Sequence, residues 1–170
     1  MDTALEKNWE VYALKYAVRS DRTRKDSFIF DDHSNDNHTI DYFIWVLKSE
    51  DSIIVVDTGF DYDEAKRRNI PIERSPSEAL KFININSADV TDVIITHLHY
   101  DHAGGLSEFP KANFHLQEDE MAYATGPCMC HETIKKPFTG EHVCQMVRSL
   151  YSGRVVFHNG IGSIQPGVKQ

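Results

Sequence analysis

The stretch at residues 93–102 has the sequence Val-Ile-Ile-Thr-His-Leu-His-Tyr-Asp-His, in which an apolar run ends in four potential metal ligands. Neutral imidazole nitrogens and a carboxylate oxygen suit a borderline cation such as Zn²⁺. In a regular strand His97, His99 and Asp101 would share one face, and His102 would lie on the other. A loop after the apolar run removes that restriction, so one segment can serve two adjacent metal ions. The alternative is a group of polar residues in a surface turn.

The ten residues 96–105, Thr-His-Leu-His-Tyr-Asp-His-Ala-Gly-Gly, resemble the dinuclear metal signature of the metallo-β-lactamase fold hydrolases. Within that superfamily they are most similar to the N-acyl homoserine lactonases. The upstream run at residues 53–59 is similar to the strand and turn whose aspartate, here Asp57, lies beneath the metal site. The resemblance covers most of the chain from about Val11, and it continues at residues 114–117, 121–126 and 153–158.

This resemblance implies a metal-dependent hydrolase with the αββα sandwich of that superfamily and two divalent metal ions, with Zn²⁺ the first choice. It assigns His97 and His99 to the first ion and Asp101 and His102 to the second. Asp101 would also be catalytic, by helping to return a proton to the alkoxide that leaves the opened lactone ring. Asp57 would orient a metal-bound histidine, or else be an ordinary polar residue at the end of a strand. The implied substrate is a small lactone, of the kind used as a quorum signal.

Two other functions remain open on the same residues. A thioester hydrolase of the glyoxalase II kind shares the Thr-His-x-His-x-Asp-His pattern and the same metal-assisted chemistry. A metal-binding remnant without turnover belongs to a different class of protein. The remnant is considered because the resemblance implies further ligands in a C-terminal half: a third histidine, a bridging aspartate and a last histidine.

Those further ligands have no counterpart in this sequence. No Asp follows Asp119, and the remaining histidines at His131, His142 and His158 do not lie in the Gly-His-Ser or Gly-His-Thr context of the third ligand. We therefore expect residues 1–170 to form a single domain that is truncated after its first half. We also expect this chain by itself to be a poor catalyst.

Composition restricts the partners. With 18 basic and 26 acidic residues the net charge is −8, which disfavours nucleic acid. No secretion signal or membrane span is visible, and three cysteines make a disulfide framework improbable, so a cytoplasmic protein is expected. The cysteines Cys128, Cys130 and Cys144, with nearby histidines, offer the alternative of a separate structural Zn²⁺ site, but their spacing favours ordinary packed residues. The sequence gives no prediction of the oligomeric state.

The pattern of apolar residues predicts an α/β fold. Residues 53–56 are apolar throughout, as in a strand that is covered on both faces. Ser75, Pro76 and Glu78 form a capping pattern for a helix over residues 75–83. The dipeptide Asn159-Gly160 predicts a tight hairpin turn between strands at residues 154–158 and 161–164. The other expected strands are 11–18, 42–47, 90–96 and 113–117, the other helices are 118–125 and 141–150, and residues 19–38 form a polar loop.

Overall fold

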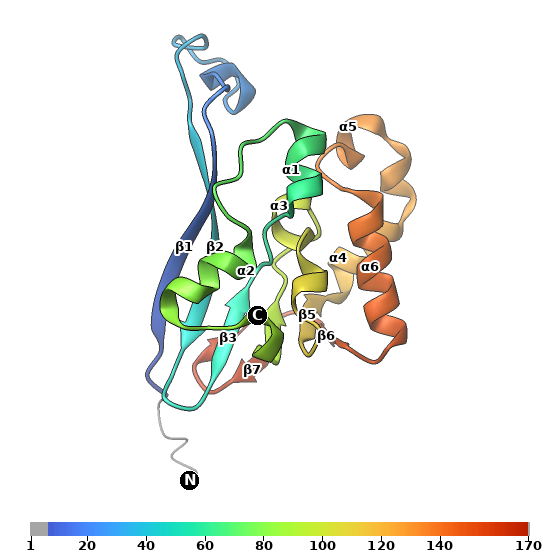
Figure 1. Cartoon of the computed structure of the whole chain (residues 1–170). Helices are drawn as coiled ribbons and strands as arrows, with labels where there is room; N and C mark the ends of the chain where they lie inside the picture. Colours follow the sequence, from blue (N-terminus) through green and yellow to red (C-terminus); the bar gives the residue numbers. More distant parts are fainter. Residues whose placement is uncertain (1–6, 170) are drawn as a thin grey trace.

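Six strands form one mixed sheet, in the order β1 to β6, in the computed structural model, which describes residues 7–169 (Figure 1). The first three strands are antiparallel neighbours, whereas β3 to β6 are parallel. Parallel neighbours need crossover connections, and most of the helices lie in these connections. The strands are β1 (Glu10–Arg19), β2 (Ile40–Lys48), β3 (Ile53–Val56), β4 (Asp92–Ile94), β5 (Asn113–Gln117) and β6 (Val155–His158).

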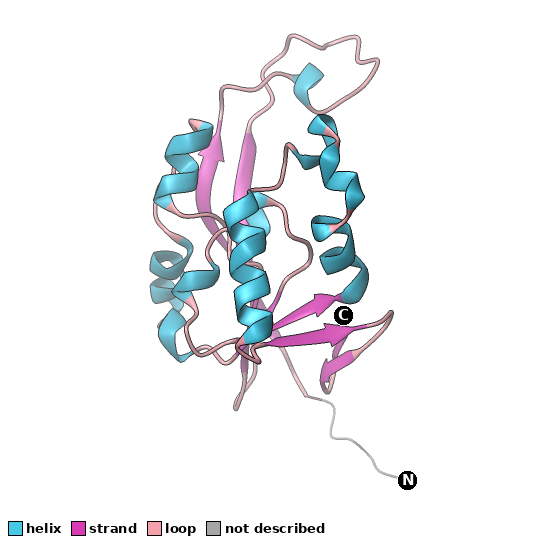
Figure 2. Cartoon of the chain, turned by 90° about the vertical axis from the view of Figure 1, so that its right-hand side faces the viewer, coloured by secondary structure: helices cyan, strands magenta, loops and turns pink. Residues whose placement is uncertain are grey.

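Helices pack against one face of this sheet (Figure 2). The α-helices are α1 (Tyr62–Arg68), α2 (Pro76–Leu80), α3 (Tyr100–Ala103), α4 (Glu118–Thr125), α5 (Glu132–Lys135) and α6 (Gly140–Tyr151). Short 3₁₀ turns are η1 (Arg24–Asp26), η2 (Lys81–Ile83), η3 (Ser87–Asp89), η4 (Leu106–Glu108) and η5 (Pro127–Cys130). No helix in the described part of the chain has both the length and the apolar character needed to cross a bilayer.

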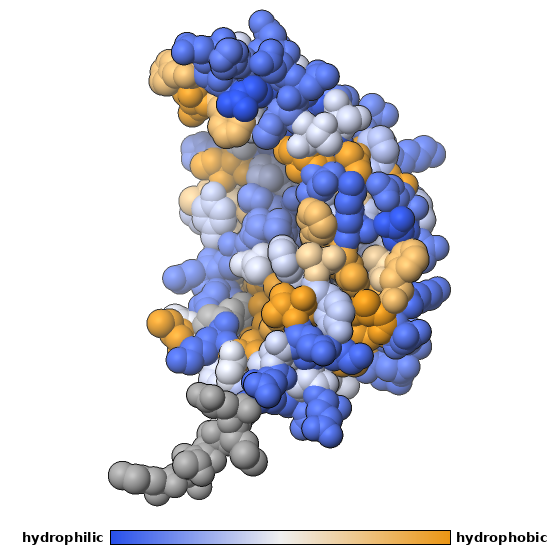
Figure 3. Space-filling view, turned by 90° about the vertical axis from the view of Figure 1, so that its left-hand side faces the viewer, coloured by the Kyte–Doolittle hydropathy of each residue, from blue (hydrophilic) through white to orange (hydrophobic). Residues whose placement is uncertain are grey.

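The other face of the sheet carries a two-stranded sheet of β7 (Ser163–Gln165) and β8 (Val168–Lys169). Strand β3 contributes to both sides, because Ile54 packs in a small cluster with Val168 while Val55 lies in the main core. Both side chains are fully buried, which confirms the prediction of a strand covered on two faces. Further along this face, Phe43 and Trp45 of β2 are exposed. Figure 3 shows apolar patches among hydrophilic side chains on this side of the molecule.

The predicted α/β class is confirmed, and most expected elements are present within a few residues. The capping box of Ser75 and Glu78 starts α2 as expected, with Pro76 at the first helical position. Helix α1 was not predicted, because its buried residues are only Glu64 and Ala65 and it has no apolar stripe. The sequence marks this helix only at its two ends, where Asp61 is the N-cap and Asn69 is a left-handed C-cap residue.

The hairpin prediction at Asn159-Gly160 is wrong. Gly160 does adopt the positive φ of a turn, at 73°, but β6 and β7 do not pair with each other. Strand β6 pairs in parallel with β5, and β7 pairs with β8. The side chain of Gln117 holds the turn instead, since it donates to the carbonyl oxygen of Gly160 and accepts from its backbone N–H.

The polar stretch between β1 and β2 forms an arm that extends beyond the sheet (Figure 1). A bridge between Thr23 and Asn37 joins its two sides, and the carboxylate of Asp26 caps the 3₁₀ turn η1 through the backbone N–H of Thr23. Ile29 and Phe30 near the tip are exposed to solvent. The arm is therefore an ordered polar structure with a few apolar side chains at its end.

A buried carboxylate ties α1 to the segment that follows α5. Glu64 is 4% exposed and accepts hydrogen bonds from Arg67, Arg68 and the hydroxyl of Thr139. Burial by itself would raise the pKa of Glu64, but these donors outweigh that effect and lower it to about 2. Arg68 also donates to the carbonyl oxygen of Phe138, at 3.5 Å.

We expect Glu64→Gln to lower the free energy of unfolding at neutral pH by about 2–3 kcal/mol, because a pKa held roughly two units below its ordinary value is worth about that much. The depressed pKa means that the contribution is complete above the ordinary value of 4.5 and is lost as the pH falls toward about 2. Denaturant unfolding of both proteins across this range should show the difference shrinking with acid.

The matched control is Glu132→Gln. Glu132 is 86% exposed and pairs only with Lys135, so its loss should change stability little at any pH. A Glu64→Gln protein as stable as the Glu132→Gln protein at neutral pH would contradict the role given to Glu64.

Candidate functional site

The four candidate ligands lie where β4 ends and α3 begins. Leu98 is fully buried and anchors the loop in the core, while the flanking His97 and His99 are only partly buried. His99 precedes the first turn of α3, and that turn carries Asp101 and His102. The change from strand to loop to helix brings together side chains that a regular strand would separate.

The imidazole of His97 contacts both of the other imidazoles in this segment. The ring centroids of His97 and His102 are 3.8 Å apart, and those of His97 and His99 are 4.3 Å apart. On the other side, Nε2 of His102 is 3.6 Å from a carboxylate oxygen of Asp101. All four predicted residues therefore lie in one cluster.

Asp57, just after β3, fixes this cluster from below. One carboxylate oxygen accepts hydrogen bonds from the backbone N–H and the hydroxyl of Thr96, at 2.8 and 2.9 Å. The other oxygen lies 2.7 Å from Nδ1 of His102. Because an ionised carboxylate can only accept, Nδ1 carries the proton, and Nε2 of a neutral His102 keeps its lone pair. Asp57 adopts a positive φ of 63°, a conformation that is uncommon for a residue other than glycine.

The loops after β3 and after β4 are joined by further backbone contacts. The N–H and the hydroxyl of Thr58 both donate to the carbonyl oxygen of His102, and that hydroxyl accepts from the N–H of Gly105. The N–H of Gly104 donates to Gly59 at 2.7 Å. A Cβ atom at Gly105 would lie 2.5 Å from the carbonyl oxygen of Thr58, so the approach requires glycine there.

Three residues that the sequence gave no reason to select also support the segment. Glu120 of α4 accepts from the backbone N–H of Leu98 at 2.7 Å. Phe138 packs edge-on against the ring of His99, with centroids 4.7 Å apart, and the guanidinium of Arg68 lies 3.7 Å from the ring of Tyr100. Each of these side chains is 22 or more positions from the residue that it contacts, so no local pattern could indicate them.

The environment keeps two of the imidazoles neutral. Burial lowers the pKa of His97 to about 4, and the neighbouring His102 and His99 add to this. Burial also lowers the pKa of His99. At His102, burial opposes the charged form, but the hydrogen bond and charge of Asp57 outweigh it and raise the pKa.

The cluster has the chemistry of a site for divalent metal ions, since it offers neutral imidazoles and a carboxylate with one histidine held by a second carboxylate. As they stand, no three His, Cys, Asp or Glu side chains between residues 7 and 169 form a ready metal-binding group. The ring of His97 lies edge-on against His99 and tilted against His102.

The other histidines and the cysteines lie outside this cluster. His115 is buried on β5. Its Nδ1 lies 3.0 Å from Nε2 of His158, and its Nε2 lies 3.1 Å from a carboxylate oxygen of Asp92. The alternative of a cysteine-containing Zn²⁺ site finds no support among residues 7–169, because Cys128, Cys130 and Cys144 are free thiols outside any metal-binding group.

Comparison with known proteins identifies the family. The model of the metallo-β-lactamase superfamily matches residues 41–139, a span that includes Asp57 and the whole donor cluster. The chain belongs to the metallo-β-lactamase superfamily. The resemblance noted in the sequence is thereby confirmed at the level of the superfamily.

Curated relatives of this superfamily member include proteins of two named activities, besides probable metallo-hydrolases. A hydroxyacylglutathione hydrolase of Saccharophagus degradans is 28% identical over 103 residues, which cover 59% of this chain and 32% of that protein. The N-acyl homoserine lactonase AttM of Azorhizobium caulinodans is 42% identical over 48 residues, covering 28% and 18% of the two chains. The chain thus spans a third or less of these relatives.

Solved structures share the fold over nearly the whole chain. A quorum-quenching N-acyl homoserine lactone lactonase superposes with a TM-score of 0.67 at 19% identity, covering 99% of this chain and 63% of that structure. A probable metal-dependent hydrolase from Staphylococcus aureus gives a TM-score of 0.70 at 16% identity, covering 96% and 63%. At such identities the likeness establishes the metallo-β-lactamase fold, as predicted.

We expect Gly105→Ala to destabilise the protein by about 1–3 kcal/mol, because the added methyl group must push the loop after β3 away from α3. Gly140→Ala is the matched control, since a Cβ atom at Gly140 would meet nothing within 4 Å. Denaturant unfolding measures both. Equal stability of the two variants would contradict the tight contact between the loops.

Proposed function

We propose that this chain carries the first part of the active site of a metal-dependent hydrolase that opens the ring of N-acyl homoserine lactones. The observation that carries the proposal is the donor cluster of His97, His99, Asp101 and His102, held by Asp57. The likeness to AttM and to lactonase structures supports the choice of substrate.

In this proposal His97 and His99 hold one divalent ion and Asp101 and His102 hold another, with Zn²⁺ as the expected metal. Such ions, when bound, activate a water molecule near neutral pH and polarise the carbonyl group of the substrate. Asp57 keeps the proton on Nδ1 of His102, so that Nε2 is the nitrogen offered to the metal. Asp101 would take a proton from that water molecule and return it to the alkoxide oxygen released when the C–O bond of the ring breaks.

A cavity beside the cluster supports a substrate with an apolar substituent. It has a volume of about 880 Å³ and lies between α4, α5 and α6, where Ala124, Met129 and Val143 contribute apolar walls. Phe138 lines this cavity and also contacts His99. An acyl chain could therefore extend past Phe138 from a carbonyl group at the cluster, with a gain in free energy for each buried methylene.

The second candidate function is the hydrolysis of a glutathione thioester. It is favoured by the hydroxyacylglutathione hydrolase relative, which matches a longer part of the chain than AttM does. The donor cluster serves either reaction. The apolar walls of the cavity suit an acyl chain, whereas Lys135 and Lys136, which also line it, suit the carboxylates of a glutathione peptide. The choice between them rests on the substrate.

Loss of a candidate ligand should remove both metal and activity. In a parent protein that supplies the remaining ligands, we expect His99→Ala and His102→Ala each to retain less metal, measured by elemental analysis, and to lose lactone hydrolysis by at least about 100-fold in kcat/KM, or about 2.7 kcal/mol. His33→Ala is the control, since His33 is an exposed residue of the arm. Full metal content and turnover in both ligand variants would refute the assignment.

Substrate preference separates the two functions. Ring opening of a lactone produces an acid, so titration at constant pH should show proton release with N-acyl homoserine lactones. Because of the apolar cavity, kcat/KM should rise by up to about fourfold for each methylene added to the acyl chain until the cavity is filled. No proton release, together with rapid cleavage of S-lactoylglutathione, would establish the thioester hydrolase instead.

A further inference from the structure

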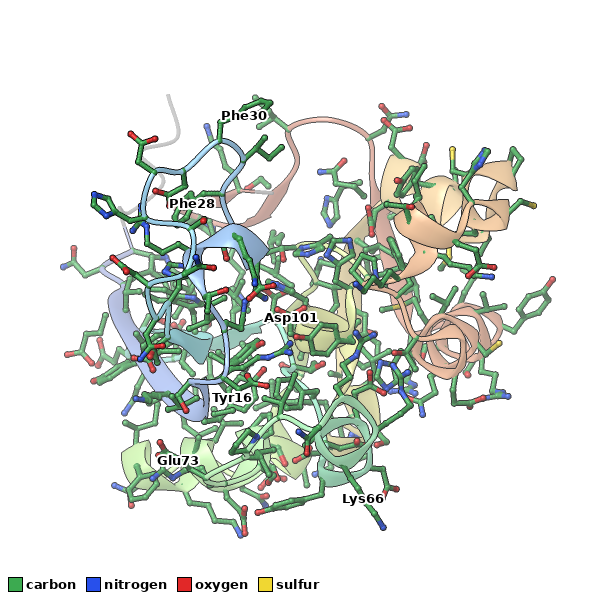
Figure 4. All side chains as sticks on the ribbon, turned by 90° about the horizontal axis from the view of Figure 1, so that it is seen from above. Tyr16, Phe28, Phe30, Lys66, Glu73 and Asp101 are labelled. Carbon is green, nitrogen blue, oxygen red and sulfur yellow. The ribbon has the colours of Figure 1, made fainter. Side chains whose placement is uncertain are left out.

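A second cavity lies between the base of the arm and the end of α5, and Tyr100 forms part of its wall. Its volume is about 440 Å³, and it shares Thr133 and Lys136 with the apolar cavity. Figure 4 looks onto this end of the molecule, with Phe28 and Phe30 marking the arm and Asp101 marking the donor segment. The remaining walls are Arg19, Asp21, Arg22, Asp26, Arg68, Tyr100 and Pro137.

The walls of this cavity are positively charged, although the protein has a net charge of −8. Four basic side chains line it, but only two carboxylates do. Arg19 is paired with Asp21, and Arg68 is paired with Glu64 outside the cavity. Among the described residues, neither Arg22 nor Lys136 forms an ion pair.

Arg22 is held in place but leaves a donor unused. One terminal nitrogen of its guanidinium donates to the carbonyl oxygen of Asp26, at 2.5 Å, and to the hydroxyl of Ser27, at 2.9 Å. Its Nε is shielded from solvent and has no hydrogen-bond partner within the described chain. A buried donor without an acceptor costs about 1–3 kcal/mol, so the protein by itself does not fully satisfy the guanidinium of Arg22.

The carboxylate of Asp26 lines the cavity but does not form an ion pair with Arg22. It accepts from the backbone N–H of Thr23 at 2.8 Å and from the hydroxyl of the same residue at 3.2 Å, so its hydrogen bonds are directed into the turn of the arm. Asp21 is likewise engaged, by Nε of Arg19 at 2.9 Å. The acceptors that line the cavity are therefore already used, whereas Arg22 and Lys136 remain available.

We propose that this cavity is a binding site for a small oxyanion, a carboxylate or a phosphate, held by Arg22 and Lys136. A guanidinium suits the paired oxygens of such a group, and the ammonium of Lys136 supplies a second charge from the segment that follows α5. The site is separate from the donor cluster, because its ligands come from the arm and from the end of α5.

The proposed anion site lies next to the segment that carries the candidate metal ligands. Tyr100 lines the cavity and lies in the sequence between His99 and Asp101, and Arg68 packs on its ring. Lys136 precedes Pro137 and Phe138, and the carbonyl oxygen of Pro137 accepts from the N–H of Tyr100 at 2.9 Å. An anion bound here therefore sits against the segment that carries the candidate ligands, next to the apolar cavity.

The test is a binding titration with inorganic phosphate and, separately, with acetate, followed by nuclear magnetic resonance at constant ionic strength. The protein is first treated with a chelator, so that neither anion can bind through a metal ion. Arg22→Gln and Lys136→Gln should each weaken binding about tenfold, the effect of losing one charge-assisted hydrogen bond. Lys136 is exposed, so its substitution should leave the thermal unfolding temperature unchanged.

Lys135→Gln is the matched control, because Lys135 is the neighbouring residue but lines only the apolar cavity. Tighter binding of phosphate would assign the site to phosphorylated ligands, and tighter binding of acetate would assign it to carboxylates. Equal losses in the Lys135→Gln and Lys136→Gln proteins, or no saturable binding of either anion, would overturn the proposal. Because the titration needs neither metal nor turnover, its result is independent of the proposed lactone hydrolysis.

Discussion

The carboxylate of Asp57 is the interaction on which the candidate site depends. It accepts from Thr96 at the end of β4 and contacts Nδ1 of His102 in α3, so one side chain ties together two strand ends and a helix. Its backbone takes a positive φ, which costs free energy that the surrounding hydrogen bonds must offset. Without this carboxylate, the loop that carries the histidines would lose its fixed relation to the sheet, and His102 would lose the group that sets its tautomer.

The rest of the site is built around that contact by close packing of backbone. Thr58 and Gly105 bring the two loops together at a distance that excludes any side chain on the glycine. Leu98 and Glu120 hold the loop from inside the fold, one by burial and the other through a hydrogen bond to the backbone. The result is a segment whose histidines differ in environment: Asp57 favours the charged form of His102, while burial keeps His97 neutral.

Two cavities of contrasting character lie beside the candidate site, one lined by Phe138 and the other by Tyr100. On one side the walls are largely apolar, and on the other they are basic. Both cavities use the segment around Lys136, and that segment is bound to α1 through Arg68, Thr139 and the buried Glu64. The salt-bridged carboxylate of Glu64 therefore helps to position the wall between the two cavities, although it lines neither of them.

The sequence by itself determined the elements with a clear period or cap, and it also indicated the cluster. The apolar run at β3, the Ser75 capping box and the close spacing of four ligands are local features, so their meaning survives without the fold. The contact between Asp57 and a ligand histidine was expected only from the resemblance, because 45 positions separate Asp57 from His102. Helix α1 and the path of the chain after Asn159 were decided by tertiary structure: α1 is held by ion pairs instead of an apolar face, and Gln117 captures the turn at Gly160. The same is true of Glu120, Phe138 and the basic cavity, because only folding brings side chains from distant elements to one place.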